Sequence, residues 1–426
     1  MAAGLSAIVP LAVLGIIVAV VVLLVRRSRS GRKEAASVGL VRRLYYYGIS
    51  FIALMVAASG ATLLLSYAAD RIHGPEWVAG GTNRLALGLA LTIVGTPIWL
   101  VQWSLAQRAA RRSPAEAQSL VRKVYIYLVL AVTVAVAAVG LTELLQWLLI
   151  GEDFGGSDVA LPLVWGVVWG FHWWLESAEG QPPVRAGGHG TEEARSVRRL
   201  YVYAASVVGL AMLGVGLWMV LRTLLHEAYN ALFVTPRPPS ELWDRQLQEA
   251  LAAGIVGGVL WGWHWLWAAR RDAGSTLRRV YFYLYAIPGG AATMVGAAIT
   301  ILVFSFQWLL GAPDLPNPSS HFDFFPGTLA ALVVGALVWA YHWQVGQGEA
   351  RAMLEEASAR RWYRYLMSAL GLGASAAGLV FLLVMLLALA APQAREVSAT
   401  AGWWRNMLGL SLALLVMGVP LWGFYW

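Results

Sequence analysis

Long apolar stretches alternate with short polar segments along nearly the whole chain. Most of these stretches exceed about 20 residues, which is enough for a helix to cross a bilayer. The pattern predicts about eleven transmembrane helices: an N-terminal one over roughly residues 5–25, and ten more that form five hairpins. The predicted hairpins cover roughly residues 44–67/85–105, 124–150/159–175, 200–226/248–268, 280–310/326–345 and 363–390/407–426.

A short polar and aromatic motif opens each hairpin. It combines two basic residues with two tyrosines, as in Arg198-Arg199-Leu200-Tyr201-Val202-Tyr203. The first tyrosines of the five copies are Tyr45, Tyr125, Tyr201, Tyr281 and Tyr363, in steps of 80, 76, 80 and 82 residues. Such regular spacing indicates internal duplication of one unit.

A second motif closes each hairpin, with a tryptophan at both ends. The copies are Trp99-Leu100-Val101-Gln102-Trp103, Trp169-Gly170-Phe171-His172-Trp173, Trp261-Gly262-Trp263-His264-Trp265, Trp339-Ala340-Tyr341-His342-Trp343 and Trp422-Gly423-Phe424-Tyr425-Trp426. The three middle copies share a histidine, which the first and last replace with Gln102 and Tyr425. Terminal repeats commonly differ from internal ones because only internal repeats pack on two neighbours.

The predicted fold is all-α and polytopic, with an N-terminal anchor followed by five helical hairpins. Because each repeat contains two crossings, all five have one orientation and are parallel repeats. The predicted boundaries are 1–37 for the anchor and its basic segment, then 38–112, 113–190, 191–271, 272–351 and 352–426 for repeats 1 to 5.

Composition and charge agree with a membrane protein. The chain is 59% hydrophobic and only 13% charged, and it has no cysteine, which excludes disulfides and thiolate metal sites. If the N-terminus lies outside, 24 of the 31 Lys and Arg residues fall on the cytoplasmic side. This bias predicts a cell-membrane protein with its C-terminus in the cytoplasm, and it explains the net charge of +8 without nucleic-acid binding.

The two motifs and the repeat of roughly eighty residues resemble a family of bacterial multi-pass membrane proteins built from a repeated two-helix domain of unknown function. The resemblance covers about residues 38–426. It implies a membrane protein and supplies no activity or site.

Both motifs are expected at the cytoplasmic ends of the helices, where Arg, Tyr, Trp and His would form a belt at one depth. Such a belt is typical of the membrane interface. Paired basic residues beside tyrosines would also suit a lipid headgroup or an acidic partner, through charge-assisted hydrogen bonds to phosphate or carboxylate. The candidate lipid or partner interface consists of Arg42, Arg43, Arg122, Lys123, Arg198, Arg199, Arg278, Arg279, Arg360 and Arg361.

His172, His264 and His342 occupy equivalent positions on parallel helices. Two facing imidazoles at that depth would ligate haem b axially. The alternative is that each histidine forms a hydrogen bond with a neighbouring backbone group or tyrosine. No metal site is predicted.

Glu143 is the one acidic residue well inside a predicted helix, with Gln146 about one turn further on. An intramembrane carboxylate indicates a proton or cation site. Glu143 also lies near enough to the outer end for a simple hydrogen bond or snorkelling, and Arg222 and His226 are expected at the same outer interface. Pro288 predicts a kink in the outgoing helix of repeat 4.

Small residues four apart, at Gly166/Gly170, Gly258/Gly262 and Ala336/Ala340, predict close helix packing.

No catalytic motif appears, and the leading prediction is a non-catalytic scaffold or accessory subunit. It would organise membrane lipids, including anionic ones, or a partner membrane complex, or would form a homo-oligomer. A transporter or channel with a path near Glu143 is the first alternative, and a haem b redox protein that uses the three histidines is the second.

Overall fold

The structure is a computed structural model. It describes residues 35–74, 81–151, 154–179, 192–236, 238, 242–270, 272, 275–313, 315–351, 357–390 and 403–426. All regular elements in these ranges are helical. The predicted anchor over residues 5–25 lies outside the described residues.

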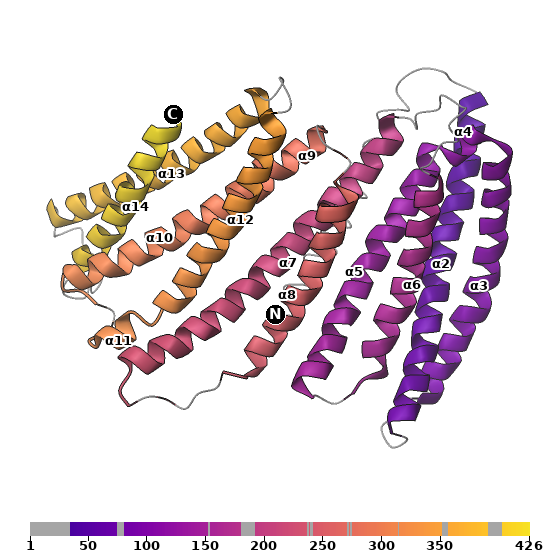
Figure 1. The fold of residues 1–426 in the computed structure, drawn as a ribbon, viewed down its shortest axis with the longest axis horizontal. Helices are drawn as coiled ribbons and strands as arrows, with labels where there is room; N and C mark the ends of the chain where they lie inside the picture. Colours follow the sequence, from indigo (N-terminus) through magenta and orange to yellow (C-terminus); the bar gives the residue numbers. More distant parts are fainter. Residues whose placement is uncertain are drawn as a thin grey trace. The chain divides into compact units, whose positions relative to one another are not determined.

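The helices follow the predicted hairpins closely (Figure 1). In chain order they are α2 (Ala35–His73), α3 (Gly81–Arg112), α4 (Pro114–Ala117), α5 (Leu120–Ile150), α6 (Gly156–Glu179), α7 (Glu192–Phe233), α8 (Arg245–Trp261), η2 (Gly262–Ala268), α9 (Thr276–Val280), η3 (Tyr281–Ala286), α10 (Ile287–Leu309), α11 (Pro318–His321), α12 (Phe325–Arg351), α13 (Ala357–Ala390) and α14 (Trp403–Tyr425). The prediction of an all-α chain is confirmed.

Eight of the described helical segments are long and apolar enough to cross a membrane. They are Gly39–His73, Thr82–Arg112, Leu120–Leu149, Arg195–Phe233, Thr276–Leu309, Phe325–Glu349, Arg361–Ala390 and Trp403–Tyr425. The other two predicted crossings, in α6 and α8, are helical but fall outside this group. Helix α6 carries Pro162, His172 and several tryptophans, and α8 has only 17 residues before a π-helical segment begins, so their crossing stays a prediction.

The chain divides into two compact units. The first contains Met1–Leu210 and Ile255–Ala269. In its described part α2 packs against α3, α5 and α6, and α5 packs along α6. The second contains Ala211–Gly254 and Arg270–Trp426, where α10 packs against α12, α13 and α14, and α13 packs along α14.

Close helix contact depends on glycines of the outgoing helices. A Cβ on Gly209 would lie 2.5 Å from the backbone nitrogen of Trp261, and one on Gly290 would lie 2.8 Å from that of Trp339. Gly371 approaches the Trp422 nitrogen in the same way. The outgoing helices of repeats 3, 4 and 5 therefore each meet the first tryptophan of their own closing motif through a glycine, which allows the backbones to approach closely.

The glycines that the sequence singled out do not do this. A Cβ on Gly166, Gly170 or Gly262 would meet no atom within 4 Å. For these three the expectation of close packing is wrong, because the returning helices turn this stripe away from their neighbours.

Two π-helical segments interrupt the regular helices at the motifs. η2 contains His264, and η3 begins at Tyr281 and ends two residues before Pro288. A π-turn holds about one residue more than an α-turn. The contact glycine of repeat 4, Gly290, accordingly lies nine residues after its motif tyrosine, whereas Gly209 and Gly371 lie eight residues after theirs.

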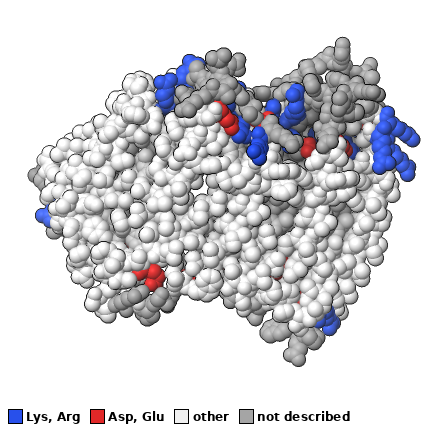
Figure 2. Space-filling model, in the orientation of Figure 1, with Lys and Arg blue, Asp and Glu red and all other residues white. Residues whose placement is uncertain are grey.

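On the face that Figure 2 shows, the charged side chains lie mostly toward the ends of the helices, and the surface between them is largely uncharged. This distribution suits helices that pass through a hydrocarbon layer.

Candidate functional site

The opening and closing motifs of a repeat meet through one hydrogen bond, which we call the closing pair. The first motif tyrosine lies 3.3 Å from the Nε2 atom of the motif histidine in Tyr125–His172, 2.9 Å in Tyr201–His264 and 3.1 Å in Tyr281–His342. In repeat 5 the hydroxyls of Tyr363 and Tyr425 lie 3.1 Å apart. Both motifs therefore lie at the same end of these hairpins, as predicted.

The second ring nitrogen of each histidine is also bonded. The Nδ1 atoms lie 2.8–2.9 Å from the carbonyl oxygens of Val168, Leu260 and Val338, one helical turn earlier. A carbonyl oxygen only accepts, so Nδ1 carries the proton and Nε2 accepts from the tyrosine hydroxyl. Each histidine is buried and neutral in this arrangement.

This geometry follows the hydrogen-bonding alternative and does not fit the haem hypothesis. An axial haem ligand needs a free nitrogen lone pair. The Nε2 lone pairs of His172, His264 and His342 each accept a tyrosine hydroxyl. Haem binding would require each tyrosine to withdraw.

Repeat 1 lacks a closing pair. Its first motif tyrosine, Tyr45, is 57% exposed, and the buried Oε1 atom of Gln102 has no hydrogen-bond partner among the described residues. Because Tyr45 is exposed and the Gln102 oxygen is buried, the two side chains do not pair. The sequence difference in this repeat thus has a structural counterpart.

Closing pairs also connect consecutive repeats. The indole of Trp169 in repeat 2 donates to the Tyr201 hydroxyl at 2.9 Å, and that of Trp339 in repeat 4 donates to Tyr363 at 3.4 Å. Tyr201 therefore accepts from Trp169 while it donates to His264, and the three form one chain. The first and last tryptophans of a closing motif also stack, with ring centroids 5.5 Å apart in Trp169–Trp173.

Arg122, a basic residue of the candidate interface, is fully buried. Its guanidinium donates to both carboxylate oxygens of Glu179, to the Tyr47 hydroxyl at 3.0 Å and to Gln107 at 3.0 Å. Tyr47 and Gln107 belong to repeat 1, so this arginine connects the first two repeats. The neighbouring Lys123 is also buried and lies 3.3 Å from Glu179.

Arg278 repeats this arrangement in the second unit. It is buried, and its Nε atom lies 2.8 Å from Glu349. Glu179 and Glu349 both lie seven residues after the motif histidine, a shared spacing that would have identified them from sequence. The structure thus corrects the predicted lipid or partner interface at three positions. The side chains of Arg122, Lys123 and Arg278 are buried and form ion pairs with carboxylates within the fold.

The remaining basic residues are more accessible or lie outside the description. Arg42 and Arg43 share Glu116, at 3.3 and 2.8 Å, and Arg198 lies 3.8 Å from Glu176. Glu176 also accepts from Tyr127 at 2.5 Å. Arg199, Arg279 and Arg361 also have partners within the fold. The side chain of Arg360 is not described.

Glu143 lies half-buried on α5. It forms no hydrogen bond or ion pair with any residue that the structure describes. Asp158, another carboxylate, is near enough for electrostatic repulsion with Glu143. The proton or cation site at Glu143 stays a prediction.

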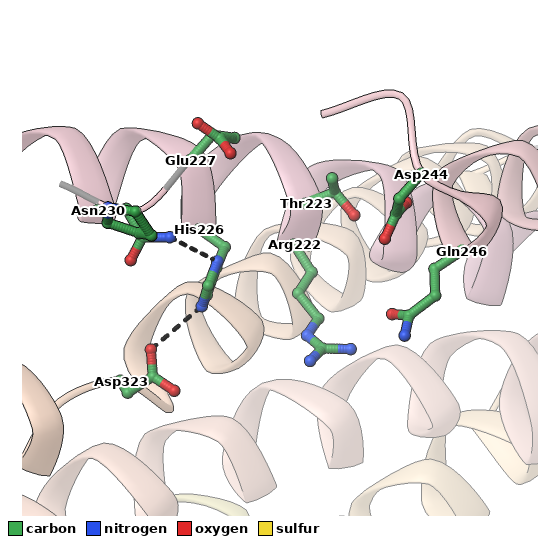
Figure 3. A pocket seen from close by; sticks show the side chains of 9 residues that line it. Arg222, Thr223, His226, Glu227, Asn230, Asp244, Gln246 and Asp323 are labelled. Atoms are coloured by element: carbon green, nitrogen blue, oxygen red, sulfur yellow. Dashed lines mark hydrogen bonds and ion pairs between the residues drawn. The ribbon is translucent and has the colours of Figure 1, made fainter. Parts of the chain in front are cut away.

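A polar pocket lies in the second unit, at the end of the hairpins opposite the motifs (Figure 3). It includes Arg222 and His226, which the sequence analysis had assigned to the outer interface. His226 Nε2 lies 3.1 Å from Asp323, and its Nδ1 lies 3.2 Å from the amide of Asn230. No local pattern predicts that Asp323, almost a hundred residues away, faces this helix.

A family model described as a domain of unknown function (DUF5671) matches residues 43–171, 199–324 and 361–426. The first matched segment covers most of repeats 1 and 2, the second covers repeat 3 and part of repeat 4, and the third covers repeat 5. No curated protein and no solved structure matches the chain.

Proposed function

The chain belongs to the DUF5671 family of domains of unknown function, and from this premise we propose that it is a non-catalytic scaffold or accessory subunit that organises lipids or a partner complex in the membrane. One observation carries the proposal. The reactive-looking side chains of the repeated motifs bind each other, as in Tyr201–His264 and Arg122–Glu179. Motif side chains that bind each other inside the fold are suited to holding hairpins in register.

Large aromatic residues remain on the outside of the same region. Trp174, next to the closing motif of repeat 2, is 64% exposed, and Trp267 is also exposed. Exposed tryptophans at helix ends anchor a protein at the interface and provide contact area for lipid or a partner.

The test is native purification of the full chain, followed by identification of lipids and proteins that remain bound. The Trp174→Leu variant should lose bound lipid or partner, whereas Val167→Leu, on the same face of α6 two turns away, should not. A full chain that retains neither lipid nor partner would refute the scaffold role.

We further infer a C-terminus in the cytoplasm, from the positive-inside bias. The absence of native cysteine makes single-cysteine labelling unambiguous. In intact cells an impermeant maleimide should modify Thr235→Cys and spare Arg112→Cys. The reverse labelling pattern would invert the topology.

Transport is the second candidate function, because Glu143 has no ion-pair partner among the described residues. In proteoliposomes Glu143→Gln should abolish a proton- or cation-dependent flux if such a flux exists. A flux that Glu143→Gln leaves unchanged would exclude a path at this residue.

A further inference from the structure

The polar pocket of the second unit has a volume of about 500 Å³. Its lining comes from the C-terminal part of α7 with Arg222 and His226, the segment between α7 and α8 with Asp244, the start of α8 with Gln246, and Asp323 before α12. This volume lies within the range of small-molecule sites, roughly 300–1,000 Å³. Eight of the nine lining residues have polar side chains, which is unusual beside so many apolar helices.

Arg222 gives the pocket a positive charge that no acidic group among the described residues neutralises. Its guanidinium forms no ion pair or hydrogen bond with any residue in the described ranges. It lies 5.9 Å from the centre of the Trp218 ring, which supports the cation from one side. In Figure 3 the Arg222 and Gln246 side chains extend toward the same space.

Two of the three carboxylates of the pocket, Asp323 and Asp244, are held in place by other groups. Asp323 is oriented by His226 at 3.1 Å, and His226 by Asn230 at 3.2 Å. Asp244 accepts from the Leu247 backbone N–H at 2.8 Å, at the start of α8. The pocket thus presents a guanidinium and fixed carboxylates that come from different elements.

This mixture of charges selects the ligand. A simple anion would meet Arg222 but also the carboxylates, and a simple cation would meet the guanidinium. A group that carries both charges satisfies each side. We propose that the pocket binds a phosphate–ammonium zwitterion, the chemistry of a phosphoethanolamine headgroup, with the phosphate at Arg222 and the ammonium at Asp323.

The location favours a lipid as the source of this group. The pocket lies at the end of a membrane-crossing segment, Arg195–Phe233, where headgroups are found. Val215 lies seven residues before Arg222, on the same stripe of α7 and about 10 Å nearer the middle of the helix. Val215 is exposed, so an acyl chain has apolar surface beside it. The inference rests on the proposed role in organising lipids and names one lipid class.

The experiment uses the full chain in nanodiscs of phosphatidylcholine, with or without phosphatidylethanolamine, and native mass spectrometry of the lipid that stays bound. Phosphatidylethanolamine should be retained over phosphatidylcholine, whose ammonium has no N–H to donate. Arg222→Gln and Asp323→Asn should each reduce this retention by roughly tenfold or more, since each removes a charge-assisted hydrogen bond. The control Arg71→Gln removes the same charge at another helix end and should have no effect.

A parallel titration adds soluble phosphoethanolamine to the phosphatidylcholine nanodiscs. Binding that depends on Arg222 and Asp323 in this arm alone would support the zwitterion site and assign it to a soluble ligand. Equal retention of both lipids together with no soluble binding, or retention unchanged in both variants, would overturn the proposal. If other lipids or a partner still co-purify in that case, the scaffold role survives and only this site is refuted.

Discussion

The hydroxyl of Tyr201 gives the most direct test of the closing pairs. It accepts from Trp169 at 2.9 Å and donates to His264 at 2.9 Å, and both Tyr201 and His264 are buried. Tyr201→Phe keeps the ring and deletes only the oxygen. The indole N–H and the imidazole Nε2 atom would then both lose their partner.

The cost follows from these two lost bonds. Hydrogen bonds between membrane helices average about 0.6 kcal/mol each, which gives about 1 kcal/mol as a lower value. A buried group left without any partner costs about 1–3 kcal/mol, which raises the total for two groups to several kcal/mol. We expect a loss of about 1–4 kcal/mol in the free energy of unfolding.

The assay is reversible unfolding of the purified chain in mixed micelles, followed by tryptophan fluorescence. Tyr45→Phe is the matched control, because Tyr45 has the equivalent place in repeat 1 but is exposed and has no closing pair. Its effect should be near zero. The double variant Tyr201→Phe/His264→Phe should cost less than the sum of the single variants, since no unpaired imidazole remains. Equal losses for Tyr201→Phe and Tyr45→Phe would refute the reasoning.

Three further predictions concern the junctions, the glycine contacts and pH. Arg122→Ala should destabilise the chain by about 3 kcal/mol or more because it removes the buried guanidinium that binds Glu179, Tyr47 and Gln107, and leaves only Lys123 beside Glu179. Arg42→Ala, at a 58% exposed side chain, should cost less than about 1 kcal/mol in the same unfolding assay. Gly290→Ala should destabilise by about 1–3 kcal/mol, since its Cβ would lie 2.7 Å from the Gly335 oxygen, while the adjacent Gly289→Ala meets nothing within 4 Å and should be neutral or slightly stabilising; similar melting temperatures for the two variants would contradict the contact. The hydrogen bond from Arg43, with its positive charge, lowers the pKa of the Glu116 carboxyl below its ordinary value of 4.5, so Glu116 stabilises the fold above that value and this contribution is lost as the pH falls through the lowered pKa. Glu116→Gln should therefore flatten the acid limb of a stability–pH profile below about pH 4.5, and a profile unchanged from that of the parent chain would contradict the assignment.

The hairpins were predictable because each depends on a local signal. An apolar run of bilayer length together with a repeated motif determines where a helix begins and ends, and all ten predicted crossings after residue 37 are helical. The meeting of Tyr201 and His264 was foreseeable in part, since a hairpin returns its closing motif to the level of its opening motif.

The hydrogen bonds of Arg122 to another repeat were harder to predict because they depend on how neighbouring hairpins pack. Arg122 contacts Tyr47 and Gln107 of another repeat, and no local pattern encodes that register. The contact glycines were missed for a related reason. A small residue permits close approach, but only the rotation of the helix decides whether Gly166 or Gly209 faces the neighbour.

The Trp169–Tyr201 bond has a consequence for the order of synthesis. Trp169 is made and inserted before Tyr201 exists, so the indole N–H of repeat 2 stays unpaired until the opening of repeat 3 leaves the ribosome. The Trp339 indole N–H likewise stays unpaired until Tyr363 is synthesised. A chain truncated after residue 190 would therefore leave the Trp169 indole N–H without its partner Tyr201.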